Sequence, residues 1–363
     1  MTTDKLAALF GMLREPVLAV RGKEIFYRNS AAGQCTGLAS LPFEAILPGY
    51  VRASEQGTFL TEIEVAGTIF SVSGSAWPND VLVLVFTENV DEDRALQTGV
   101  IASSVRVIRE PMSLLKYAAD YILPIVEELG EEKSRKYSAM MYRGIFGVMR
   151  GINRLDAFTD LHGETFSMQR TQTHFDLVRV CGEIVETVVK LLDLPSQRLI
   201  FTSKPGTKMV YAERHLIERM LLCLIDNALR FTDTESVISI SIRDTPDRAI
   251  IVVTDDGDGI SDNARPNIWS RYTQWQDLTD TKRGGGFGLS LVQSIARRHG
   301  GGTLIESNPG EGTSVIVSIE AENTSYGVYE EKEQYGAALT MAEIFTELVD
   351  HVPSKKFTPR YFD

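Results

Sequence analysis

LLCLIDNALRFT, residues 221–232, decides the fold of the C-terminal half of this 363-residue chain. The stretch lies in a helical pattern and places Asn227 and Arg230 three residues apart, so both side chains share one helix face. An amide oxygen suits Mg²⁺, and a guanidinium suits phosphate. The stretch therefore predicts a helix with one face equipped for a metal ion and an anion.

A second motif, TDDGDGI at residues 254–260, directly follows a strand pattern. Asp255 is placed to accept a hydrogen bond from an adenine amino group, and Gly257 and Gly259 let the backbone pass close to a base. A calcium loop is the alternative, but an EF-hand needs Glu at its twelfth position, which counted from Asp256 is Asn267.

A third motif, KRGGGFGLSLVQSIARRHGG at residues 282–301, begins a predicted helix with glycines. Glycines at a helix start expose backbone amides, and the helix N-terminus favours anions. The candidate phosphate ligands here are Lys282 and Arg283, expected on a lid, with Gly284, Gly286 and Gly288. His299 is interpreted as a helix-end histidine rather than a catalyst.

The fourth motif is SNPGEGTSV, residues 307–315, where Thr313 follows a tight turn and offers a hydroxyl donor for phosphate. Around the four motifs the pattern is α/β. Helices are predicted at 175–192 and 213–231, and strands at 198–202, 208–212, 303–307 and 313–320, with a hairpin over 237–256. The order of the motifs on this frame carries more weight than any one of them.

Together these motifs resemble the nucleotide-binding boxes of sensor histidine kinases, which belong to the Bergerat-fold (GHKL) ATPases together with gyrase and heat-shock-90 chaperones. The segments PNIWSRYTQW and HGGGTLIESNPGEGTSVIV belong to the same resemblance. It implies an α/β sandwich over residues 166–320 that binds ATP and Mg²⁺, with Asn227 as the metal ligand. The implied nucleotide-binding residues are Asn227, Arg230, Asp255, Gly257, Gly259, Lys282, Arg283, Gly284, Gly286, Gly288, Leu289 and Thr313; we assign no catalytic residue.

Residues 91–165 predict two long helices around a polar turn at 127–136. Apolar residues at alternating spacings of four and three form one seam on each helix, typical of packing against other helices. The first seam runs Val105, Ile108, Met112, Leu115, Ala119, Ile122, and the second Met141, Ile145, Val148, Ile152, Leu155. One hairpin cannot bury both faces, so we expect a homodimer through an antiparallel four-helix bundle.

This hairpin resembles the dimerisation and phosphoacceptor region of the same kinases, whose box runs His-Glu-x-x-Thr/Asn-Pro. Aligned on Pro111, Arg106 replaces the histidine, Val107 the acidic base and Glu110 the Thr or Asn. A neutral imidazole can attack a phosphate, whereas a guanidinium stays protonated and only donates hydrogen bonds. The box therefore lacks its phosphoacceptor, and Arg106 is either a solvated charge or a ligand for phosphate or for a partner's acidic pocket.

A further departure from the kinases is Cys223, four residues before Asn227, where they have Asn or His and the hydrolysing relatives a Glu base. A thiol is a poor ligand for Mg²⁺ and no substitute for a carboxylate base. Hydrolysis of the chaperone kind is therefore disfavoured, and the metal would be held by Asn227 and water.

Residues 1–90 predict a small α+β unit that resembles a PAS sensory domain, with PVLAVRGKEIFYRNSAAGQ as its first strand pair and helix. The unit is either a sensor or a dimerisation module without ligand. It contains no histidine, which excludes a histidine-ligated haem. Residues 321–363 form a tail that begins with an acidic stretch, continues with one amphipathic helix, LTMAEIFTELVDHV, and ends with the basic and aromatic stretch KKFTPRYFD. The fold class is thus multidomain α+β.

The net charge of −12 disfavours non-specific nucleic-acid binding. The sequence contains no apolar run near 20 residues and no signal-peptide pattern, and three separated cysteines form no disulfide or zinc pattern, so we expect a cytoplasmic protein. The resemblance favours an ATP-binding, dimeric pseudokinase regulator, with a response regulator or histidine-phosphotransfer protein as partner. The alternatives are an active kinase that phosphorylates histidine on a partner in trans and, less favoured, an ATPase switch.

Overall fold

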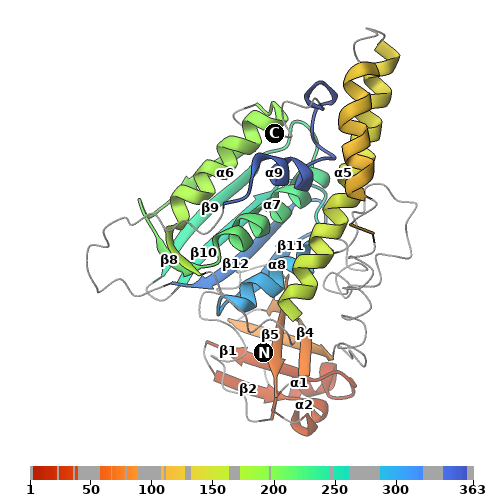
Figure 1. The fold of residues 1–363 in the computed structure, drawn as a ribbon. Helices are drawn as coiled ribbons and strands as arrows, with labels where there is room; N and C mark the ends of the chain where they lie inside the picture. Colours follow the sequence, from red (N-terminus) through yellow and green to blue (C-terminus); the bar gives the residue numbers. More distant parts are fainter. Residues whose placement is uncertain are drawn as a thin grey trace.

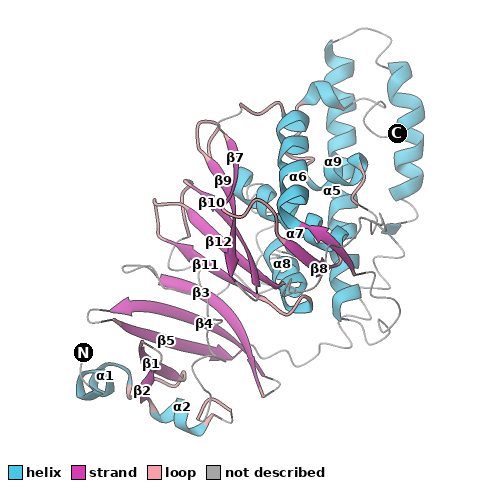
Figure 2. Cartoon of the chain, turned by 90° about the vertical axis from the view of Figure 1, so that its left-hand side faces the viewer, coloured by secondary structure: helices cyan, strands magenta, loops and turns pink. Residues whose placement is uncertain are grey.

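The computed structural model describes residues 3–22, 24–35, 37–39, 58–66, 68–77, 80–88, 108–109, 112–126, 132–162, 172–195, 198–245, 248–260, 287–321 and 338–357. Most strands belong to one long mixed sheet, and a layer of helices covers its C-terminal half (Figures 1 and 2).

The C-terminal half of the sheet has the order β11-β12-β10-β9-β7. Alternating apolar residues explain its strands, because Ile238, Ile240 and Ile242 all point into the core and are fully buried. The strands are β7 Leu199–Ser203, β9 Ile238–Thr245, β10 Arg248–Asp255, β11 Gly302–Ser307 and β12 Thr313–Glu320. The predicted hairpin and closing strands are confirmed.

Three helices cover one face of this half: α6 Leu177–Leu192, α7 Arg214–Arg230 and α8 Phe287–Arg298 (Figure 2). The helix expected from residue 175 begins at Leu177, because residues 173–176 form strand β6 (Thr173–Asp176) paired with β8 (Met209–Ala212). Asp176 ends the strand, and its carboxylate accepts the N–H of Val178 as the helix cap.

The N-terminal half has the strand order β2-β1-β5-β4-β3, and the strands predicted from the sequence are present. Its elements are α1 Thr3–Phe10, β1 Val17–Arg21, β2 Glu24–Arg28, α2 Ser30–Gln34, β3 Thr58–Val65, β4 Thr68–Trp77 and β5 Val81–Glu88. Buried Asn29 links β1 and α2, since its Oδ1 accepts the N–H groups of Val17 and Ala32, both at 2.9 Å.

Strand β3 pairs antiparallel with β11, so the two halves form one ten-stranded sheet. Across this junction the hydroxyl of Thr61 donates to the carbonyl oxygen of Thr303 at 2.8 Å. The small N-terminal unit and the C-terminal α/β unit are therefore joined through backbone hydrogen bonds as well as through the chain.

Residues 112–126 are helical and lie antiparallel to α5 (Glu132–His162), as the hairpin prediction requires (Figure 1). Arg109 pairs with Asp156 near one end, and Lys116 lies over the ring of Phe146 closer to the turn. Arg106 and Pro111 lie outside the described residues.

The apolar seams of the hairpin are only partly covered. Ala119, Ile145 and Ile152 are buried, whereas five other seam residues are about half exposed: Ile108, Leu115, Ile122, Met141 and Val148. This single chain therefore leaves an apolar stripe on its hairpin open to solvent.

The C-terminal segment, residues 338–357, packs between α5 and α7 (Figure 1). Helix α9 spans Met341–Glu347, shorter than the sequence pattern, with Thr340 and Glu343 forming its capping box. A short 3₁₀ turn, η3 Ser354–Lys356, follows. Leu348, Val349, Val352 and Phe357 are buried, so the segment is part of the core. Within the described ranges, no helix is long and apolar enough to cross a membrane.

Candidate functional site

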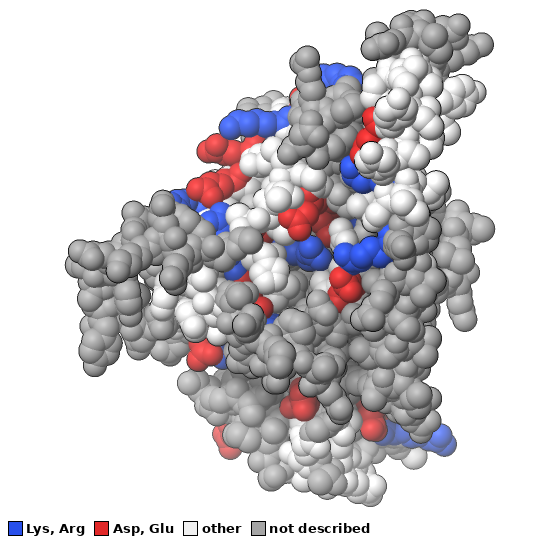
Figure 3. All heavy atoms as spheres, viewed as in Figure 1, with Lys and Arg blue, Asp and Glu red and all other residues white. Residues whose placement is uncertain are grey.

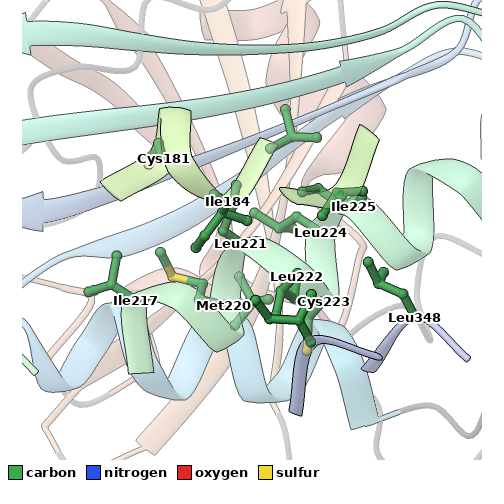
Figure 4. Close-up of a cluster of buried hydrophobic side chains, with 14 of the residues drawn as sticks. Cys181, Ile184, Ile217, Met220, Leu221, Leu222, Cys223, Leu224, Ile225 and Leu348 are labelled. Carbon is green, nitrogen blue, oxygen red and sulfur yellow. The ribbon is translucent and has the colours of Figure 1, made fainter. Parts of the chain in front are cut away.

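Helix α7 positions the first candidate residues. Its inner face is apolar and packs against α6 and the sheet (Figure 4). The last turn brings Asn227 against the first turn of α8. A Cβ added to Gly288 would lie 3.7 Å from Asn227 Oδ1, an ordinary van der Waals contact, so the two helices meet at these residues.

Cys223 lies one helical turn before Asn227 on α7, where its thiol interacts electrostatically with Arg154 and Asp226. It is fully buried in the hydrophobic cluster, together with Leu348 of the C-terminal segment (Figure 4). Burial raises the pKa of its thiol to about 12, so the group is neutral at physiological pH. The side chain that replaces the kinases' polar residue is therefore a core residue here.

Asp255 ends β10 and is buried. Burial raises the pKa of its carboxyl, while backbone hydrogen bonds from Gly257 and Thr313 partly oppose the shift. Thr313 is paired with Asp255 across β10 and β12. We predicted an adenine contact for Asp255 and a phosphate contact for Thr313 from the sequence, and the structure places the two residues opposite each other on β10 and β12.

The DDGDGI turn is held by close backbone contacts. A Cβ on Gly257 would lie 2.2 Å from the carbonyl oxygen of Phe231, the residue that ends α7. Gly259 has φ +66°, and a Cβ there would lie 2.0 Å from the carbonyl oxygen of Asn308. Any side chain at these positions would push the turn away from α7 and from the β11–β12 turn.

The third motif is described only in part. Gly288 and Leu289 lie in the first turn of α8, and Leu289 packs against the hydrophobic core. The other four predicted phosphate ligands lie outside the described residues: Lys282, Arg283, Gly284 and Gly286.

Arg230 lies in a group of charged side chains that we call the charge cluster. It brings together three arginines, three carboxylates and one histidine: Arg150, Arg154, Arg230, Asp226, Glu347, Asp350 and His351. On the surface seen in Figure 3, which is viewed as in Figure 1, acidic and basic side chains lie next to one another near the middle. Arg230 Nη2 lies 3.2 Å from Asp226 and 3.0 Å from Asp350, so its guanidinium is paired within the protein.

Asp226 is the centre of the charge cluster and is 1% exposed. Burial alone would raise the pKa of its carboxyl. The hydrogen bond with His351 and the charges of the arginines outweigh that effect and hold the pKa well below its usual range. The carboxylate therefore stays ionised and binds α5, α7 and the C-terminal segment together.

Residues 212–323 match the family described as histidine kinase-, DNA gyrase B-, and HSP90-like ATPase. This chain contains a histidine kinase-like ATPase domain. The match covers the described strands β9 to β12, helices α7 and α8, and every candidate nucleotide-binding residue.

Curated relatives of the chain are sensor histidine kinases. The adaptive-response sensory kinase SasA of Crocosphaera subtropica is 31% identical over 62% of this chain and 60% of its own length. The sensor protein KdpD of Clostridium acetobutylicum is 29% identical over 62% of this chain but only 25% of its own. The chain thus corresponds to part of the length of each relative. Full-length ShkA, solved in complex with AMPPNP, shares the fold with a TM-score of 0.50, at 17% identity over 61% of this chain and 46% of that one.

Within the ATPase domain, sequence reasoning missed Ser307. Its hydroxyl accepts the N–H of Ile260, donates to the carbonyl oxygen of Gly312 and lies 3.1 Å from the hydroxyl of Thr313. Ser307 therefore ties the DDGDGI turn to the start of β12. Its position directly before the NPGEG turn was the available signal.

His299 has a structural role in the domain, as the sequence predicted. It is buried directly after α8, its Nδ1 lies 2.8 Å from the carbonyl oxygen of Ile295, and its Nε2 accepts the N–H of Glu213. Burial lowers the pKa of the ring, which keeps it neutral.

Proposed function

We propose that the ATPase domain binds ATP with Mg²⁺ and that the chain is a pseudokinase regulator which does not phosphorylate itself. One structural observation and one sequence observation support the proposal. The base-binding turn is built as a close-fitting unit around Asp255, while arginine stands at the histidine position of the phosphoacceptor box.

The base end comprises Asp255, Thr313 and the DDGDGI turn. We assign the adenine amino group to the Asp255 carboxylate, an acceptor that a buried amino donor requires. Thr313 is assigned to the base as well, in place of the phosphate role expected from the sequence, because it lies beside Asp255. Gly257 and Gly259 have no side chains, so the backbone of the turn can lie close to a bound adenine ring.

The metal site has a single protein ligand in this proposal. Asn227 supplies an amide oxygen next to Gly288, whereas Cys223 is a fully buried thiol, a poor ligand for Mg²⁺. The described residues include no group of three or more His, Cys, Asp and Glu side chains arranged to hold a metal ion. This arrangement suits Mg²⁺ carried in by the nucleotide, since Mg²⁺ commonly keeps waters and phosphate oxygens as most of its ligands.

The absent phosphoacceptor follows from chemistry. In the kinases that the hairpin resembles, a neutral histidine nitrogen takes the phosphoryl group. Arg106 offers only donors, and Val107 offers no base. We therefore propose that nucleotide binding, rather than phosphotransfer from this box, is the output of the domain.

The remaining parts fit a signalling role. The half-exposed apolar stripe on the hairpin supports a homodimer through residues 91–165, because a second hairpin would bury it. The N-terminal sheet with its helices α1 and α2 is proposed as a PAS-like sensory unit. A response regulator or a histidine-phosphotransfer protein is the proposed partner.

The kinase relatives favour one alternative, an active enzyme that phosphorylates histidine on another protein. Incubation with γ-labelled ATP, with and without candidate phosphotransfer proteins and receiver domains, separates the two. We expect bound nucleotide with no label on either protein. Acid-labile label on the partner alone would establish the alternative.

A further inference from the structure

Arg154 reaches from the helical hairpin into the proposed nucleotide site. A Cβ added to Gly288 would lie 3.7 Å from Arg154 Nη1 and 3.7 Å from Asn227 Oδ1. Helix α5 thus contributes a cation to the junction of α7 and α8, beside the proposed metal ligand. No motif in the sequence singled out this arginine.

A carboxylate of the C-terminal segment forms an ion pair with this arginine. Arg154 Nε donates to Glu347 at 2.9 Å and Nη2 to Asp226 at 3.0 Å. One helical turn from Asp226, Arg230 is paired with Asp350 at 3.0 Å. Two of the three carboxylates in the charge cluster therefore come from the C-terminal segment.

Charge balance shows what these two carboxylates do. The charge cluster holds three guanidinium groups and three carboxylates. Without Glu347 and Asp350, Asp226 would be the only carboxylate left in the charge cluster for the three arginines, of which Arg154 lies beside the start of α8. A cluster with that excess of positive charge is a strong site for a polyphosphate, because guanidinium and phosphate oxygens form paired, charge-assisted hydrogen bonds.

The contact of Glu347 is also incomplete. The carboxylate is 2% exposed, yet its Oε1 has no hydrogen-bond partner in the described structure. A buried, unpaired carboxylate oxygen costs free energy, so this ion pair is weaker than a fully bonded one. The segment is also held by the other ion pairs of the charge cluster, by its apolar residues, and by Lys355 and Lys356, which pair with Asp193 at its far end.

Building on the proposed ATP site, we propose that Arg154 is a further phosphate-binding residue of that site. Glu347 and Asp350 compete with the terminal phosphates of the nucleotide for Arg154 and Arg230. Triphosphate binding and docking of the C-terminal segment therefore weaken each other by the same factor. AMP, which lacks the terminal phosphates, does not take part in this competition.

Calorimetric titration of the full chain with ATP and with AMP tests the proposal through the ratio of the two affinities. Glu347→Gln removes the competing charge and keeps an oxygen for Arg154, so we expect ATP affinity to rise about ten-fold with AMP affinity unchanged. Arg154→Ala is expected to lower ATP affinity about ten-fold at constant AMP affinity. Because a loss of folding changes both affinities together, the ratio is insensitive to it.

The matched control is Glu343→Gln, on the same helix but outside the charge cluster, where glutamine keeps the capping box. It should leave the ratio unchanged. An ATP-to-AMP ratio in Glu347→Gln equal to that of the unmodified chain would overturn the proposal even if Arg154→Ala did not fold. If ATP binding requires Asp255 and the ratio stays constant in both variants, only this inference fails. If neither the unmodified chain nor Glu347→Gln binds either nucleotide, the proposed function fails as well.

Discussion

The base end of the ATPase domain and the charge cluster around Asp226 are each stabilised by a different kind of contact. At the base end, turns approach so closely that a Cβ on Gly312 would lie 2.1 Å from the carbonyl oxygen of Asp255. In the charge cluster, three segments of the chain meet through ion pairs around Asp226. An added Cβ at Gly257, Gly259 or Gly312 would meet backbone atoms at the base end, whereas the charge cluster is stabilised by opposite charges.

The largest effect is expected where an added atom meets backbone. Gly312 has φ +85°, so Gly312→Ala combines left-handed strain with a clash against β10. We expect the free energy of unfolding to fall by about 4 kcal/mol, measured by urea denaturation, with loss of nucleotide binding.

The matched control is Gly310→Ala, in the same turn with φ +78° and no atom within 4 Å of the added Cβ. It carries only the strain, about 1–2 kcal/mol. Equal losses for the two variants would show that crowding at the base end has no energetic weight.

Loss of charge at the centre of the charge cluster comes next. Asp226→Asn leaves three arginines facing an amide, and we expect a loss of about 3 kcal/mol in the free energy of unfolding at pH 7. The pKa of the Asp226 carboxyl is depressed by folding, so its contribution is present above the unfolded pKa of about 4 and is lost as pH falls below that value. The variant should therefore lose stability less steeply below pH 4 than the unmodified chain. If the free energy of unfolding fell equally steeply below pH 4 in both proteins, the pH dependence could not be assigned to Asp226.

A smaller effect separates binding from folding at the base end. Asp255→Asn keeps the size of the side chain but presents a neutral amide to the adenine amino group. We expect ATP affinity to fall about 30-fold, the equivalent of about 2 kcal/mol, with little change in the urea midpoint. Unchanged affinity by calorimetry would refute the adenine contact.

The smallest effect is expected in the phosphoacceptor box. Arg106→His alone should produce no robust autophosphorylation, because Val107 provides no base for the new imidazole. Phosphoramidate analysis by mass spectrometry after incubation with ATP measures this directly. Strong labelling of the variant would show that the box lacks only its histidine.

Features with a local sequence pattern could be predicted, whereas contacts between distant segments could not. The alternation of Ile238, Ile240 and Ile242 and the glycines of DDGDGI are local signals, and each gave the correct strand or turn. Pairings between distant segments leave no such pattern. Arg154 and Glu347 are 193 residues apart, and Thr61 and Thr303 are 242 apart.

Thr313 shows how far the role of a single residue can be predicted from sequence. Its turn was identified correctly, but its partner depends on the register between β10 and β12, which places it opposite Asp255. A hydroxyl after a turn does not reveal in sequence which end of a ligand it faces. The two halves of the sheet also looked independent in sequence, since an edge strand shows no sign of which other edge it will pair with.

The most direct test of the central claim is one incubation of the purified chain with γ-labelled ATP and Mg²⁺, read by equilibrium dialysis and by acid-lability of protein-bound label. We expect each chain to bind about one nucleotide reversibly, with no label left on the polypeptide after the nucleotide is removed. Retained acid-labile phosphate on the chain, or a dialysis cell with equal nucleotide on both sides, would contradict it.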